Sequence, residues 1–219
     1  NKSIGEEVYL SDTINPLIDN NKEKFIRRQW YSDLLRELSD TFKDFTDTKF
    51  VIEKFDDFEQ YSYSFSGFYD MSEDKKYIVL NLSKKHKKFE MNNKMFNDFK
   101  FLLSQVIQHE SIHQCQWSNR PDFKEPVTVD FRDNGAGMSK EEERTYLADM
   151  DEIDAYGHDI ALEIKYFYPK TDPLKVLRYP SRYKKITSYF IYNKAFKGID
   201  WNNIKKRLIR KAYDWTIVN

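Results

Sequence analysis

The chain has little cysteine, no net charge and no long apolar run. Its one cysteine, Cys115, cannot form an internal disulfide, which favours a reducing compartment or a fold without crosslinks. Thirty-six basic residues balance thirty-six acidic ones, so no overall field draws the chain to nucleic acid or to an anionic membrane. No apolar run approaches the roughly 20 residues that cross a bilayer, and the first residues lack the apolar segment of a signal peptide. We therefore expect neither nucleic acid nor membrane among the partners, and an intracellular or virion-associated protein rather than a secreted one.

Apolar and aromatic residues are plentiful enough for a packed interior. Hydrophobic residues make up 40% of the chain and aromatic residues 16%, in spite of 33% charged residues. At 219 residues we expect a single domain, 1–219. Its first part, 22–117, should carry a helix, a sheet and a second helix, and its second part, 139–219, should be helical. Lysine, asparagine, tyrosine and phenylalanine are abundant, and this composition is typical of compact proteins from phages and other viruses.

The spacing of apolar residues predicts an α+β fold. Spacings of three and four predict an amphipathic helix over 22–45 and a second helix over 93–117. Between these helices, alternation with period two predicts a small antiparallel or mixed sheet. Its expected strands are 49–55, 61–66 and 77–82. The strand at 77–82 is either an ordinary core strand or one that pairs with an extended substrate.

The second part of the chain reads as a loop followed by helices. Residues 118–138 contain two prolines and a glycine-rich turn, which is typical of a long loop. Ser139 and Glu142 fit a capping box, so a third helix should begin there and continue to near Pro169. The remainder, 172–217, looks helical. Its last segment has a basic stripe that favours a solvated face over contact with a membrane or nucleic acid: Lys205, Lys206, Arg207, Arg210 and Lys211.

The second predicted helix carries the motif His109-Glu110-Ser111-Ile112-His113. Two histidines four residues apart project from one face of a helix, one turn apart, so their ring nitrogens can bind one ion. Glu110 lies about 100° further around the helix, where it can reach a water without being a ligand. The spacing predicts a Zn²⁺ site with Glu110 as general base. The alternative is a pair of surface histidines or of hydrogen-bonded core histidines.

A catalytic zinc usually takes three protein ligands, so a third must come from elsewhere. The best candidates lie in 149–158, after the long loop. Here the sequence resembles the gluzincin metallopeptidases, in which a glutamate on a later helix completes HExxH. Glu152-Ile153-Asp154-Ala155 is similar to the Glu-x-[Asp/Glu]-Ala stretch of minimal gluzincins, which include small bacterial peptidases that cleave transcriptional repressors. The resemblance implies a zincin-like fold, Glu152 as third ligand and Ala155 as the small residue that lets the two helices approach. His158 remains a rival ligand.

One position departs from the gluzincin pattern. Many relatives have an aspartate or asparagine four residues after the ligand, where this chain has Tyr156. Asp149 or Asp154 could supply the carboxylate that supports the ligands. Such sites also use a side chain to stabilise the oxyanion. The candidates for that role are Tyr156, His158, Arg120, Tyr183 and Tyr189.

These observations lead us to expect a zinc-dependent peptidase that acts on a protein or peptide substrate. The alternative is a non-enzymatic structural or interaction protein, for example a virion component, with a structural or vestigial zinc site. In either case the chain could be a component of a larger assembly.

Overall fold

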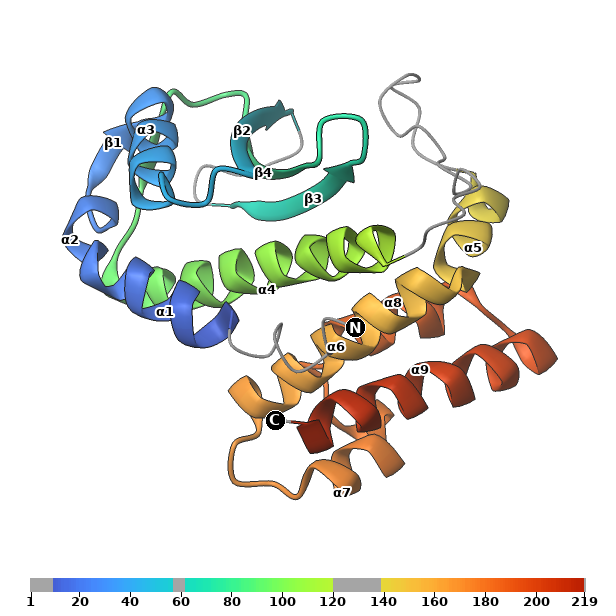
Figure 1. Ribbon diagram of the computed structural model, residues 1–219. Coiled ribbons are helices and arrows are strands. Elements are labelled where there is room, and N and C mark those ends of the chain that lie inside the picture. Colours follow the sequence, from blue (N-terminus) through green and yellow to red (C-terminus); the bar gives the residue numbers. More distant parts are fainter. Residues whose placement is uncertain (1–9, 57–61, 120–138, 219) are drawn as a thin grey trace. The chain divides into compact units, whose positions relative to one another are not determined.

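The computed structural model describes residues 10–56, 62–119 and 139–218 (Figure 1). The fold is α+β, with small sheets and mostly helical content, which confirms the predicted class. The chain divides into two compact units, Asn1–Trp117 and Ser118–Asn219. That these units make up one domain stays a prediction. The predicted loop 118–138 lies almost entirely outside the described residues.

The first unit combines helices with two small sheets. Its elements, in chain order, are α1 (Leu10–Asn20), α2 (Lys22–Phe25), β1 (Arg28–Trp30), α3 (Tyr31–Thr41), β2 (Thr48–Phe55), β3 (Ser64–Asp70), β4 (Lys75–Ser83), β5 (Lys88–Glu90) and α4 (Asn93–Ser118). The long helix α4 confirms the helix predicted over 93–117.

The larger sheet is mixed and has the strand order β2-β4-β3. Strand β2 pairs with β4 in parallel, and β3 pairs with β4 in antiparallel register from Ser64↔Asn81 to Asp70↔Lys75. The strand predicted at 61–66 therefore begins later and runs further, with Tyr61 outside the described residues. Because β4 is paired on both sides, its backbone groups are already used. The suggestion that 77–82 pairs with a substrate is wrong.

The helix predicted over 22–45 is also wrong. Helix α2 ends at Phe25, β1 then pairs antiparallel with β5, and α3 begins at Tyr31. Backbone hydrogen bonds hold the interruption at both ends: Met91 N–H donates to Arg27 (3.3 Å) and Tyr31 N–H donates to Lys87 (3.1 Å). Pairing with a strand about 60 residues away along the chain overrides a local periodicity.

A single apolar core joins the sheet to α4, which lies along one face of the sheet (Figure 1). Phe96, Phe99, Leu103 and Ile107 follow the spacing of three and four that places them on one side of α4, and all are buried. They pack in the same cluster as the inward side chains of β4, from Ile78 to Leu82. This packing fixes the rotation of α4 about its own axis.

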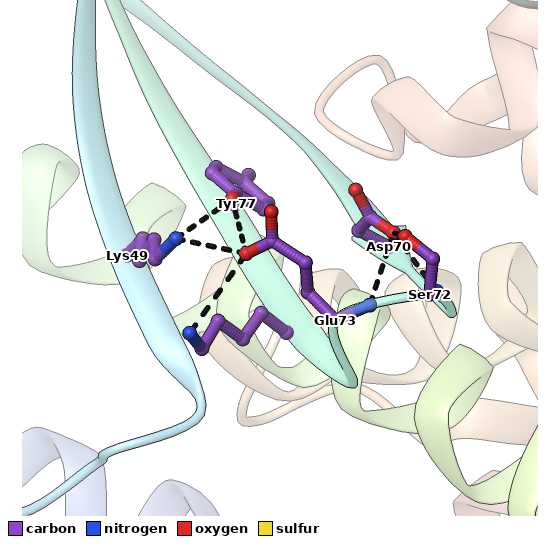
Figure 2. Close-up of polar contacts among 6 residues, drawn as sticks. Lys49, Asp70, Ser72, Glu73 and Tyr77 are labelled. Atoms are coloured by element: carbon purple, nitrogen blue, oxygen red, sulfur yellow. Dashed lines mark hydrogen bonds and ion pairs between the residues drawn. The ribbon is translucent and has the colours of Figure 1, made fainter.

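Polar contacts fix the turn between β3 and β4 (Figure 2). Asp70 Oδ1 accepts hydrogen bonds from the Ser72 hydroxyl (2.7 Å) and from the Ser72 backbone N–H (3.0 Å). Glu73 accepts from Lys49 on β2 and from Tyr77 on β4, each at 2.9 Å. These bonds from Lys49 and Tyr77 lower the pKa of Glu73 below its usual value. The network links all three strands at the end where β3 turns into β4.

The second unit is helical. Its elements are α5 (Lys140–Ala148), α6 (Met150–Phe167), α7 (Pro173–Arg178), the 3₁₀ turn Pro180–Arg182, α8 (Thr187–Ala195) and α9 (Gly198–Val218). The capping box of Ser139 and Glu142 is confirmed. The predicted single helix from 139 to 169 is in fact two helices, because Asp149 has an extended backbone and its side chain caps α6 by accepting from Asp151 N–H (2.8 Å).

Helices α6 and α9 pack closely, side by side (Figure 1). A Cβ atom added at Gly157 would lie 2.6 Å from the Cβ of Lys211 and 3.0 Å from the backbone nitrogen of Ala212. Glycine therefore permits the approach of the two helices at this point. Within the described parts of the chain, none of the helices has both the length and the low polarity that crossing a bilayer requires.

Candidate metal centre

Helix α4 brings the two motif histidines together within the first unit. The helix starts where the Asn92 side chain accepts a hydrogen bond from Met95 N–H (3.0 Å), and its apolar side packs in the core. Its C-terminal half then carries His109, which is buried, and His113, which is half-buried. Their ring centroids lie 4.9 Å apart with the ring planes at 74°. Two imidazoles at this separation can share one ion.

A neighbouring glutamine orients one of these rings. His113 Nδ1 lies 2.9 Å from Gln116 Oε1, one turn further along α4. In the tautomer in which Nδ1 donates this hydrogen bond, the Nε2 lone pair of His113 is left for a metal. Hydrogen bonds of this kind are usual for histidines that bind metals.

Glu110 is held against strand β3. It is 4% exposed, and a Cβ atom added at Gly67 would lie only 2.6 Å from Glu110 Oε1 and 2.7 Å from Glu110 Cγ. The strand can pass this close to the carboxylate because residue 67 has no side chain. The role of Gly67 was not predicted from the sequence. A single glycine in a strand indicates that another group comes close to the backbone, but it does not indicate which group.

Glu152 lies in the first turn of α6, in the second unit. The Asp149 cap sets where this helix begins and so which side chains occupy its first turn. Glu152 is 8% exposed, which is rare for a glutamate without a charged or metal partner.

His109, His113 and Glu152 form a cluster that could hold a metal ion. Each residue offers one ligand atom, an imidazole nitrogen from the two histidines and a carboxylate oxygen from the glutamate. Glu152, which the family resemblance implied as the third ligand, is therefore the acidic residue of this cluster. The rival ligand, His158, is not one of its members.

Comparisons of the chain with protein-family models, with curated proteins and with solved structures find no match.

The two aspartates expected to support the ligands make other contacts within the second unit. Asp149 caps α6, as described above. Asp154 accepts a hydrogen bond from the indole N–H of Trp215 (3.2 Å) and forms an ion pair with Lys211 (2.9 Å), and both partners are on α9. Asp154 therefore helps to join α6 to α9. A supporting role for either carboxylate at the metal stays a prediction.

Four of the five residues considered as oxyanion stabilisers lie in aromatic clusters of the second unit. The Tyr156 ring packs edge-on against Tyr192, with centroids 5.3 Å apart, and the buried His158 ring packs against Trp215 at 4.8 Å. Tyr183 packs against Tyr168, and Tyr189 is buried next to Trp201. Arg120 lies outside the described residues. A catalytic role for any of the five stays a prediction.

Helices α6 and α8 carry further buried polar groups that were not predicted from the sequence. Asp159 and Glu163 follow Glu152 by seven and eleven residues, which places all three on one stripe of α6, and all three are buried. The hydroxyl of Tyr192 on α8 is buried without a hydrogen-bond partner in the described part of the chain. Burial, together with the nearby charges of Tyr156, Glu152 and Asp159, raises the pKa of Tyr192 well above 10. The helical spacing of the acidic residues was the signal available in the sequence.

Glu163 holds the start of α8. Its carboxylate accepts hydrogen bonds from the hydroxyl groups of Thr187 and Ser188 and from Ser188 N–H (3.2 Å). Complete burial raises the pKa of Glu163 to about 7, with a further rise from the charge of Asp159, although the hydrogen bond from Thr187 opposes the shift.

We expect Glu163 to make the protein less stable as the pH rises from about 4.5 to about 7. In that range the folded state retains a proton that the unfolded state has lost, so raising the pH favours unfolding. The difference between the two pKa values corresponds to at most about 3 kcal/mol of unfolding free energy. Glu163→Gln keeps the shape of the protonated side chain and cannot ionise.

Urea titrations at pH 5 and pH 7.5 measure this effect. From pH 5 to pH 7.5 the unfolding free energy of the wild type should fall relative to that of Glu163→Gln. The variant should then be the more stable protein at pH 7.5. If the difference between the two proteins is the same at both pH values, Glu163 does not titrate in this range.

Proposed function

We propose that the protein is a zinc-dependent peptidase of the gluzincin type, in which His109, His113 and Glu152 hold the ion and Glu110 is the general base. The observation that carries this proposal is the cluster of two imidazoles and a carboxylate, with Glu110 next to one of its histidines in the chain. A zincin-like fold is part of the proposal. It is supported by the α+β architecture and by the HExxH helix along one face of a small sheet.

The donor set suits zinc. Two histidine nitrogens and one carboxylate oxygen are a usual set for catalytic zinc, whereas calcium and magnesium prefer oxygen ligands alone. With three protein ligands a fourth position is left for water. An ion held there would supply Lewis acidity, which makes water more acidic and polarises a carbonyl group.

Glu110 supplies the proton transfers. In peptide hydrolysis the attacking water loses a proton and the leaving amine gains one, so one carboxylate can accept the first and donate the second. Burial of Glu110 beneath β3 holds the carboxylate in one place before the substrate arrives. The same glutamate would therefore act as base and then as acid.

The position of β3 supports a peptide as the substrate. In the described part of the sheet β3 pairs with β4 alone and is therefore an edge strand, the kind of strand that an extended peptide chain can join. Gly67 places that backbone directly against Glu110. A peptide paired with β3 would present its carbonyl groups close to the general base.

Replacing Gly67 with alanine is expected to reduce peptide hydrolysis about 100-fold, because a displacement of about 1 Å at a catalytic group has an effect of this size. The added Cβ would overlap Glu110 Oε1 and force the carboxylate to move. Zinc content should be unchanged, since Gly67 is not a ligand. Glu53→Ala, at an exposed position on β2 of the same sheet, is the control, and an equal loss in both variants would mean that the sheet itself had been disturbed.

The proposal is tested by metal analysis together with hydrolysis of fluorescein-labelled casein and of a quenched peptide library. We expect about one zinc per chain, loss of hydrolysis after treatment with a chelator, and recovery when zinc is returned. Zinc-loaded protein that hydrolyses neither substrate, with X-ray absorption showing four protein ligands and no water, would instead support the structural-protein alternative.

A further inference from the structure

A groove between α7 and α9 in the second unit has a volume of about 830 Å³. The two helices pack side by side (Figure 1). Helix α7 contributes its last two residues, Leu177 and Arg178. The lining residues of α9 begin at Asn202 and end at Tyr213 with spacings of three, one, three, one and three, so they form one face of that helix. The basic stripe noticed in the sequence is therefore partly one wall of a concave surface.

The charge of this groove is positive and uncompensated. Four cationic side chains line it, namely Arg178, Lys205, Lys206 and Arg210, and none of the lining residues is acidic. No ion pair in the described part of the chain involves any of these four residues. The chain as a whole is neutral, so this is a local concentration of charge rather than a general property of the surface.

The remainder of the groove is largely apolar. Of its lining residues, Leu177 is buried, Ile209 is half-buried, and Tyr213 is 40% exposed. A ligand that offered only phosphate groups would leave this apolar surface in contact with water. Nucleic acid is also a poor match. Sites for single-stranded nucleic acid stack successive bases on several aromatic side chains, whereas Tyr213 is the one aromatic residue among the lining residues.

We propose that the groove binds an acidic segment of a partner protein, with alternating acidic and apolar side chains. The aspartates and glutamates would pair with the four cations, and the apolar side chains would contact Leu177, Ile209 and Tyr213. Exposed ion pairs are individually weak, so both the charge and the apolar contact are needed for specific binding. This site is separate from the peptidase proposal and does not depend on it.

Fluorescence anisotropy with three labelled 15-residue peptides tests the site. The first alternates glutamate with leucine, the second replaces glutamate by glutamine, and the third replaces leucine by serine. Every protein used carries Glu110→Gln, so that no peptide is cleaved. Only the first peptide should bind with saturation, and its affinity should fall as salt is added.

Charge reversal locates the binding. Lys206→Glu with Arg210→Glu should weaken binding of the first peptide about tenfold or more, because like charges then face its glutamates. Tyr213→Ala should weaken binding by a smaller factor through lost apolar contact. The matched control is Lys165→Glu with Lys170→Glu, two exposed lysines of the same unit outside the groove, which should change the affinity less than about twofold.

Several results would overturn this assignment. They are the absence of saturable binding by the first peptide, equal binding of the glutamine peptide, and equal weakening by the control pair. Tighter binding of a 15-nucleotide single strand of DNA, or of vesicles containing phosphatidylserine, would assign the groove to a different class of partner. Circular dichroism of each variant checks that the fold is intact.

Discussion

Glu110→Gln is expected to reduce peptide hydrolysis by about 10³-fold or more while the protein retains its zinc. The substitution keeps the size of the side chain but removes its ability to accept a proton, and positioned general bases contribute about 10² to 10⁴ in rate. Glu110 has the largest expected effect on turnover because the same carboxylate serves both proton transfers. Hydrolysis of the quenched peptide library and zinc content by mass spectrometry measure the two properties separately.

The matched control for this substitution is Glu53→Gln on β2, an exposed glutamate in the same unit. It should leave both hydrolysis and zinc content unchanged. Full activity in Glu110→Gln would show that this carboxylate is not the base. Loss of zinc together with activity would show instead that Glu110 contributes to holding the ion.

His113→Ala and Glu152→Gln are each expected to lower zinc content from about one per chain to near zero. Each substitution removes one of three zinc ligands. Loss of a residue that only hydrogen-bonds to a ligand lowers zinc affinity by up to roughly 100-fold, so the loss of a ligand itself should lower zinc affinity by more. Glutamine at position 152 preserves packing around this buried side chain, which separates loss of the ion from loss of the fold. Zinc content after dialysis and competition with a fluorescent chelator give the stoichiometry and the affinity.

The controls match the ligand variants in chemistry. His86→Ala changes a histidine of the first unit and Glu141→Gln an exposed glutamate of the second, and neither belongs to the cluster. Both should retain zinc. If Glu152→Gln also retains zinc while His113→Ala loses it, the third ligand is another residue, and His158→Gln becomes the next variant to analyse.

Local patterns predicted those elements that local interactions stabilise. The helix over 93–117 was predictable because its apolar side repeats at three and four over several turns. The capping box at Ser139 was predictable because it needs only a serine and a glutamate three residues apart. The pair His109 and His113 follows from the same helical geometry, since one turn separates them.

Predictions failed where distant segments decide the backbone. The periodicity over 22–45 was real, since Phe25, Leu34 and Leu38 are all buried in one core. It did not reveal that β5 pairs with 28–30 and interrupts the helix between them. Similarly, nothing local identified β4 as the central strand, because that depends on which neighbours pair with it.

The sequence alone determined that His109, Glu110 and His113 lie on one helix with the two imidazoles one turn apart, because helical geometry is set by the backbone. Only the tertiary structure decided that Gly67 is the residue against Glu110, that Glu163 is buried at the start of α8, and that the basic stripe of α9 lines a groove. Each of these depends on which side chains from separate elements meet, and the burial and electrostatics of a group are properties of its neighbours in space rather than in the chain.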